Sequence, residues 1–127
     1  TAAKDHHGGL IQHPLVVKEV FYSDNRAFAL RTGKVVRTDL PQRRGCGTMA
    51  ASNHSMFYRA HFHGMWDLEA NNQIQFEGIR SGCWLGIIPA QGLMLAPGNG
   101  SACGCTHAIQ TSAAWVPRSA LKKKPKE

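Results

Sequence analysis

The stretch VFYSDNRAFALRTGK at residues 20–34 returns in modified form further along the chain. Residues 56–72 read MFYRAHFHGMWDLEANN, and residues 93–98 begin again with an apolar triplet, LMLAPG. Phe21 and Phe57 are 36 residues apart. Self-similarity at a fixed period of a few tens of residues is typical of repeat architectures. The sequence therefore predicts a structural unit that is repeated about every 36 residues.

A second apolar segment precedes each triplet, and a short turn candidate separates the two. The preceding segments are PLVV (14–17), TMAA (48–51) and WLGII (84–88). The turn candidates are Lys18-Glu19, Asn53-His54 and Ala90-Gln91-Gly92. Apolar runs joined by two or three turn residues are typical of β-hairpins.

Helical periodicity is not sustained in any segment, so the sequence predicts an all-β chain. A repeat of this length built from four antiparallel strands favours a β-propeller blade. We expect about three blades, at 10–44, 45–80 and 81–117. Residues 1–9 are a lead-in and residues 118–127 a basic Lys/Pro tail. Because three blades are too few to close a ring, the chain is expected to be part of a larger propeller or to complete one by association.

The end of the predicted third strand carries a recognisable motif. Residues 27–34, AFALRTGK, resemble the A-L-D-x-x-T-G-K signature of PQQ-like β-propeller repeats. In that signature Thr-Gly turns the chain into the outer strand, with glycine at positive φ. The second unit keeps the signature's aspartate as Asp67, whereas the first has Ala29 there and Arg37 where a docking tryptophan usually follows.

The third unit resembles the C-terminal blades of long bacterial proteins of this family. It carries G-x-R-x-G-C-W at 78–84 and a C-x-C segment followed by Gln-Thr-Ser at 103–112. The resemblance covers about residues 8–118 and implies export to the periplasm or the extracellular space. It also implies either a non-catalytic binding scaffold or, as the alternative, part of a quinoprotein dehydrogenase that oxidises an alcohol or sugar with PQQ and calcium.

The four cysteines of the chain permit several interpretations. Cys103, Cys105 and His107 form C-x-C-x-H, which lacks the C-x-x-C-H spacing of covalent haem attachment. The spacing also fits poorly with the C-x-x-C knuckles of structural zinc sites. Export, which the resemblance implies, favours structural disulfides among Cys46, Cys83, Cys103 and Cys105. Metal binding and buried thiols remain as alternatives.

Two histidines are a candidate metal site. His61 and His63 would lie on one face of an extended strand, and they would suit a metal only if a third ligand converged on them. Surface or loop histidines are the competing interpretation.

Arg80 and Trp84 are the candidate cofactor residues, because quinone-binding propellers clamp an anionic planar cofactor with arginine and stack it on tryptophan. Packing of Trp84 between blades and pairing of Arg80 with a turn is the alternative. No catalytic residue is assigned, since Asp67 is the only candidate base and the repeat signature already accounts for it. The scaffold interpretation requires no cofactor.

Composition limits the remaining function classes. The chain has 127 residues, 43% of them hydrophobic and 18% charged, which is typical of a folded domain. The net charge is +7, but residues 122–127 supply a large share of it, and the aromatic residues are not interleaved with basic ones. We therefore expect no nucleic-acid partner and no transmembrane segment. The expected partners are further propeller blades or another chain, with a protein or polysaccharide as ligand.

Overall fold

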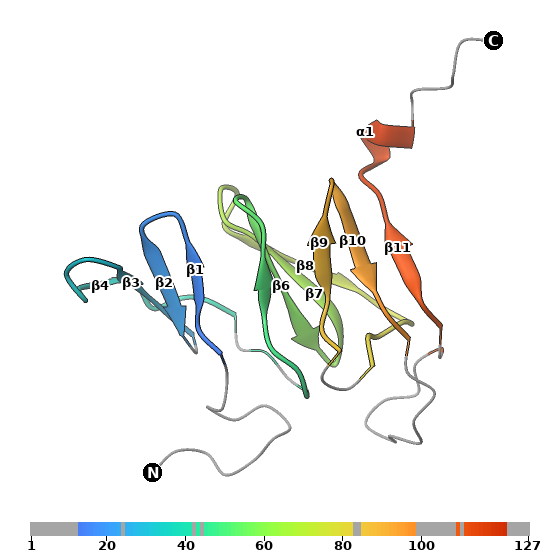
Figure 1. Ribbon diagram of the computed structural model, residues 1–127, viewed down its shortest axis with the longest axis horizontal. Coiled ribbons are helices and arrows are strands. Elements are labelled where there is room, and N and C mark those ends of the chain that lie inside the picture. The colour runs from blue at the N-terminus through green and yellow to red at the C-terminus, as the bar shows by residue number, and fades with distance from the viewer. Residues whose placement is uncertain are drawn as a thin grey trace.

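The described residues of the computed structural model form eleven strands in three antiparallel sheets and one short helix (Figure 1). The residues it describes are 13–23, 25–41, 43, 45–82, 85–98, 109 and 111–121. Sheet 1 contains β1 (Leu15–Val17), β2 (Val20–Ser23), β3 (Arg26–Ala29) and β4 (Val35–Arg37). Sheet 2 contains β5 (Ala50–Ala51), β6 (Ser55–Ala60), β7 (Phe62–Asp67) and β8 (Asn72–Phe76). Sheet 3 contains β9 (Ile88–Ala90), β10 (Leu93–Ala96) and β11 (Ala113–Trp115), and the helix α1 is Arg118–Leu121. The expectation of an all-β chain is confirmed.

Each sheet is a meander in which consecutive strands pair, and the three sheets stand side by side in chain order (Figure 1). Between sheets, the closest backbone contacts join β1 to β5 and β5 to β9. The backbones of neighbouring sheets therefore approach one another at their first strands. No helix in the described part of the chain is long and apolar enough to cross a membrane.

The hairpin turns lie where the sequence predicts them. Val17 pairs with Val20 across Lys18-Glu19, and Leu93 pairs with Ala90 across Gln91-Gly92. Gly33 has a φ of 67° between β3 and β4, as the Thr-Gly motif requires. In sheet 2 the corresponding turn places Asn71 at a φ of 55°. Asparagine is one of the few residues that tolerate this conformation, so the turn survives the loss of glycine.

The alignment of the first two units on Phe21 and Phe57 is wrong by one residue. The Glu19 carbonyl accepts the N–H of Leu30 at 2.9 Å, and the His54 carbonyl accepts the N–H of Leu68 at the same distance. Glu19 is therefore equivalent to His54, and Phe21 is equivalent to Met56. A shift of one position matters because it moves a strand residue to the opposite face of its sheet.

A second correction concerns the first strand of the third sheet. The apolar run at 84–88 was expected to form it, but β9 is Ile88–Ala90. Leu85 donates its N–H to the Gly82 carbonyl in a turn, and Gly86 has a φ of 72°. These conformations are incompatible with an extended strand before residue 88. The described part of sheet 3 has three strands, one fewer than the other two sheets.

Two apolar clusters hold the sheets together. The first lies between sheets 1 and 2 and joins Val17, Tyr22 and Ala27 to Met56, Tyr58 and Trp66, with Leu40, Met49 and Ala60 completing it. The second lies between sheets 2 and 3 and contains Phe57, Ile87 and Met94, with Met65, Phe76 and Trp115 packed against them. Sheet 2 is thus covered on both faces.

The two clusters distinguish the two faces of each sheet. We call the face turned to the following sheet in the chain the forward face, and the face turned to the preceding sheet the rear face. Tyr22 and Phe57 are equivalent forward residues on the second strands. Trp66 and Trp115 are equivalent rear residues, since each pairs with a methionine, Met56 or Met94, of the strand before it. The same pairing in sheet 1 joins Phe28 to Phe21. One aromatic rear residue therefore recurs in every sheet.

Arg37 takes the place of the expected docking tryptophan and still connects two sheets. Its guanidinium lies 5.9 Å from the ring centroid of Trp66 and donates to the side-chain oxygen of Asn71. It also donates two hydrogen bonds to Asp39, at 3.0 and 2.9 Å. The Arg37 hydrogen bond, with one from Asn71, lowers the pKa of Asp39 to about 2. A cation over the ring of Trp66 thus links sheets 1 and 2 at this junction.

Candidate functional site

A hollow in the described part of the chain lies between sheets 2 and 3. It has a volume of about 460 Å³ and is mostly apolar. Its walls include Phe57, Met65 and Phe76 from sheet 2 and Met94, Trp115 and Pro117 from sheet 3 and the segment after it. Ser52, Ser55 and Gln91 add the polar groups. A few polar groups at one side of an apolar concavity are typical of sites that bind small ligands or single side chains.

At the edge of the hollow, two apolar residues of sheet 1 have small polar equivalents in sheet 2. Val17 and Val20 pack into the cluster between sheets 1 and 2. Their equivalents across the β5–β6 turn are Ser52 and Ser55, whose backbones pair at 2.9 Å. Each serine lacks the second methyl-sized branch of valine and carries a hydroxyl, so this edge of the hollow is wider and more polar than the equivalent edge between sheets 1 and 2.

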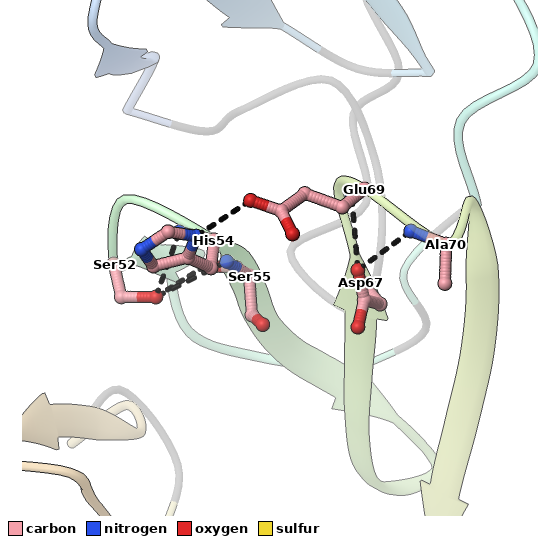
Figure 2. Close-up of polar contacts among 6 residues, drawn as sticks. All are labelled: Ser52, His54, Ser55, Asp67, Glu69 and Ala70. Atoms are coloured by element: carbon pink, nitrogen blue, oxygen red, sulfur yellow. Dashed lines mark hydrogen bonds and ion pairs between the residues drawn. The ribbon is translucent and has the colours of Figure 1, made fainter.

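The β5–β6 turn beside the hollow is held by the Ser52 side chain, as Figure 2 shows. The Ser52 Oγ accepts the backbone N–H of His54 at 3.3 Å and that of Ser55 at 3.1 Å. It also donates to the Ser55 carbonyl at 3.4 Å. Because the hydroxyl is engaged with the backbone in this way, its role is to shape the turn, and the arrangement does not activate it as a nucleophile.

His54 and Glu69 form an exposed pair above this turn (Figure 2). The His54 Nδ1 lies 2.8 Å from the Glu69 Oε1, and both side chains are largely exposed. Asp67 Oδ1 accepts the N–H groups of Glu69 and Ala70 at 2.9 and 2.8 Å. These backbone hydrogen bonds lower the pKa of Asp67. The Asp67 carboxylate therefore serves as a turn cap, and its lowered pKa makes it a weaker base than a free carboxylate.

His63 lies at the opposite, buried end of the same interface. Its side chain is completely buried, and its ring meets the edge of Trp115 with 4.9 Å between centroids. Within the described residues neither ring nitrogen has a hydrogen-bond partner. Burial, with a smaller contribution from the charge of Arg59, lowers the pKa of His63 to about 4. The imidazole is therefore neutral at pH 7.

The expected common face of His61 and His63 is not formed. His61 is the single residue between β6 and β7, with a φ of 68°, while Ala60 pairs directly with Phe62. The strand therefore reverses at His61, and only His63 belongs to β7. Among the described residues no group of three or more His, Cys, Asp or Glu side chains is arranged to hold a metal ion.

The candidate cofactor and disulfide residues are only partly described. Arg80 is buried after β8, next to the bridge between Ile79 and Ile109, whereas Trp84 lies outside the described residues. Cys83, Cys103 and Cys105 also lie outside them.

The remaining cysteine, Cys46, is buried in a loop that two arginines support. Arg43 donates hydrogen bonds of 2.6 Å to the carbonyls of Gly45 and Gly47. A Cβ at Gly45 would lie only 2.7 Å from the Arg59 side chain. The loop therefore packs directly against Arg59, on the face of sheet 2 that also carries His63.

Comparisons with known protein families, with curated proteins and with solved structures found no match for this chain.

The hollow itself could not be read from the sequence. The sequence feature that marks its edge is the presence of Ser52 and Ser55 at the positions that Val17 and Val20 occupy in the first unit. This difference can be recognised only when the two units are aligned in the correct register. The apolar residues that line it are indistinguishable in sequence from residues of a filled core.

Proposed function

We propose that this chain is a β-propeller segment that acts as a non-catalytic binding scaffold outside the cytoplasm, with the hollow between sheets 2 and 3 as its ligand site. The propeller assignment is supported by three antiparallel meanders in chain order that approach at their first strands. Close approach at one edge of each sheet is what sheets arranged around an axis require. The extracytoplasmic location is supported by the resemblance of the cysteine-bearing segment.

The observation that carries the proposed binding role is the hollow of about 460 Å³. Aromatic side chains of Phe57, Phe76 and Trp115 offer flat surfaces to a sugar ring or to an apolar side chain of a protein. The hydroxyl of Ser55 and the amide of Gln91 supply hydrogen-bonding groups at the polar side. The hollow thus has the size and chemistry for one sugar residue or one large side chain of a partner.

The quinoprotein alternative gains no support from the described residues. Trp84 lies outside them, and Asp67 is engaged as a turn cap by the N–H groups of Glu69 and Ala70. We therefore place the binding role first.

The binding role is tested by titration with the fluorescent probe 8-anilinonaphthalene-1-sulfonate, followed by soluble oligosaccharides and aromatic peptides as competitors. We expect a saturable component of binding in the hollow, and competition for this component by one of the two ligand classes. Ser55→Trp places an indole in the hollow and should abolish this binding. Lys34→Trp adds the same side chain to an exposed turn of sheet 1 and should leave it unchanged. Binding that Ser55→Trp leaves intact would refute the proposed site.

A further inference from the structure

Two apolar faces of the molecule have no covering sheet in the described structure, and they are the two outer faces of the row of sheets. The rear face of sheet 1 carries Val16, Phe21, Phe28 and Val35, which pair with one another in register across all four strands. The forward face of sheet 3 carries Ile88, Leu95 and Ala114, which also pair in register.

Both faces are open to solvent to an extent unusual for apolar strand residues. Val16 and Val35 are 55% and 51% exposed, and Ile88 is 49% exposed. Phe21 and Phe28 are half-buried, and their rings lie against each other with centroids 5.9 Å apart. Contiguous apolar surfaces of this kind mark interaction sites on soluble proteins.

The internal interfaces of the molecule show what covers such faces. Where sheet 1 meets sheet 2, the forward residues Leu15, Tyr22 and Ala27 pack against the rear residues Met56 and Trp66. The forward residues of sheet 3 equivalent to Leu15, Tyr22 and Ala27 are Ile88, Leu95 and Ala114. The rear residues of sheet 1 equivalent to Met56 and Trp66 are Phe21 and Phe28.

We infer that the rear face of sheet 1 docks head to tail on the forward face of sheet 3 in a second copy of this chain. The chain carries both halves of this interface, and each half repeats the chemistry of an interface already formed inside the molecule. The contact is heterologous, because it joins two different faces, so it can propagate or close into a ring. This inference rests on the propeller assignment, but it does not depend on whether the hollow binds a ligand.

The association is tested by sedimentation of the full chain at tens of micromolar, where we expect the mass of two or more copies of the 13.9 kDa chain. Val16→Lys and Ile88→Glu each place a charge on one exposed face, on the first strands where the sheets approach most closely. Each variant alone should weaken association at least about 30-fold, since a central charge costs as much as the loss of a strong interface contact. Leu121→Lys, at an exposed site on α1, is the control and should associate like the wild type.

A mixture of the Val16→Lys and Ile88→Glu variants distinguishes head-to-tail docking from docking between two identical sheets. An equimolar mixture should form dimers again, because the unaltered sheet 3 of the Val16→Lys chain can meet the unaltered sheet 1 of the Ile88→Glu chain. A wild-type chain that sediments as a folded monomer would overturn the inference. So would an Ile88→Glu chain that associates normally, or a mixture that stays monomeric. Failure of the ligand titration would leave these results unaffected.

Discussion

The two interfaces between sheets are built from equivalent positions, yet one is a filled core and the other contains a hollow. Between sheets 1 and 2, Val17, Tyr22 and Trp66 pack in one continuous cluster. Between sheets 2 and 3, Phe57 and Trp115 occupy two of the same positions, but Ser52 replaces the valine. The repeat thus keeps its large residues to hold adjacent sheets and varies its small ones to create or remove a site.

The largest expected difference between the interfaces concerns their equivalent tryptophans. Trp66 is 9% exposed within a packed cluster, so Trp66→Ala should reduce the free energy of unfolding by about 3–5 kcal/mol. Trp115 borders the hollow, so Trp115→Ala should cost about half as much, because fewer contacts are lost. Urea denaturation followed by circular dichroism measures both. Equal losses would show that the two interfaces are packed to the same degree.

Acid should weaken the interface between sheets 2 and 3 through His63. The pKa of His63 is about 4 in the folded chain and the ordinary value is 6.5, so the unfolded state binds the proton first as the pH falls. The contribution of neutral His63 to the free energy of unfolding is fully present above pH 6.5. It is lost as the pH falls from about 6.5 to 4, to a total of roughly 3 kcal/mol.

Denaturation curves of wild type and His63→Phe at pH 7.5 and pH 4.5 measure this effect. The wild type should lose more stability than the variant on acidification, and the excess is the contribution of His63. If His63→Phe loses as much stability as the wild type on acidification, groups other than His63 cause the acid sensitivity.

A reciprocal exchange of Val20 and Ser55 sharpens the comparison. Ser55→Val adds apolar volume to the hollow and should stabilise the chain by about 1 kcal/mol. Val20→Ser removes both methyl groups of the valine from the filled interface and introduces one hydroxyl, which should cost about 1–2 kcal/mol. Thermal unfolding of the two single variants and the double variant measures these changes. Destabilisation by Ser55→Val would indicate that the hollow cannot accept the added group.

The smallest expected effect concerns the exposed side-chain pairs that bridge equivalent turns. Glu19 pairs with Arg31 at 2.9 Å in sheet 1, and His54 pairs with Glu69 at 2.8 Å in sheet 2, with the acidic residue on the opposite turn. All four side chains are largely exposed. Glu19→Gln and Glu69→Gln should therefore each change the free energy of unfolding by less than about 0.5 kcal/mol, and high salt should reduce the difference. A loss above about 1 kcal/mol in either variant would contradict a purely exposed pair.

Local features of the fold were predictable from sequence, and features that depend on register were not. The Gln91-Gly92 turn and the positive φ of Gly33 follow from glycine turn chemistry, and the Lys18-Glu19 turn follows from its place between two short apolar runs. The equivalence of Phe21 with Met56 could not be predicted in this way. Met56 and Phe57 are neighbouring apolar residues, and either matches Phe21 of the first unit almost equally well. The reversal of the chain at His61 was also missed, since histidine carries no strong turn preference.

The strand pairing of this molecule has a kinetic consequence. Every strand pair described joins strands that are neighbours in the chain, and the bridge between Ile79 and Ile109 is the only pairing outside them. Short-range hairpins close within microseconds, because little chain entropy is lost when nearby segments meet. Each meander can therefore form as soon as its own segment is available, before the next has been synthesised. We expect the slow step of folding to be the docking of preformed sheets, so the refolding rate should respond to Trp66→Ala far more than to changes in the hairpin turns.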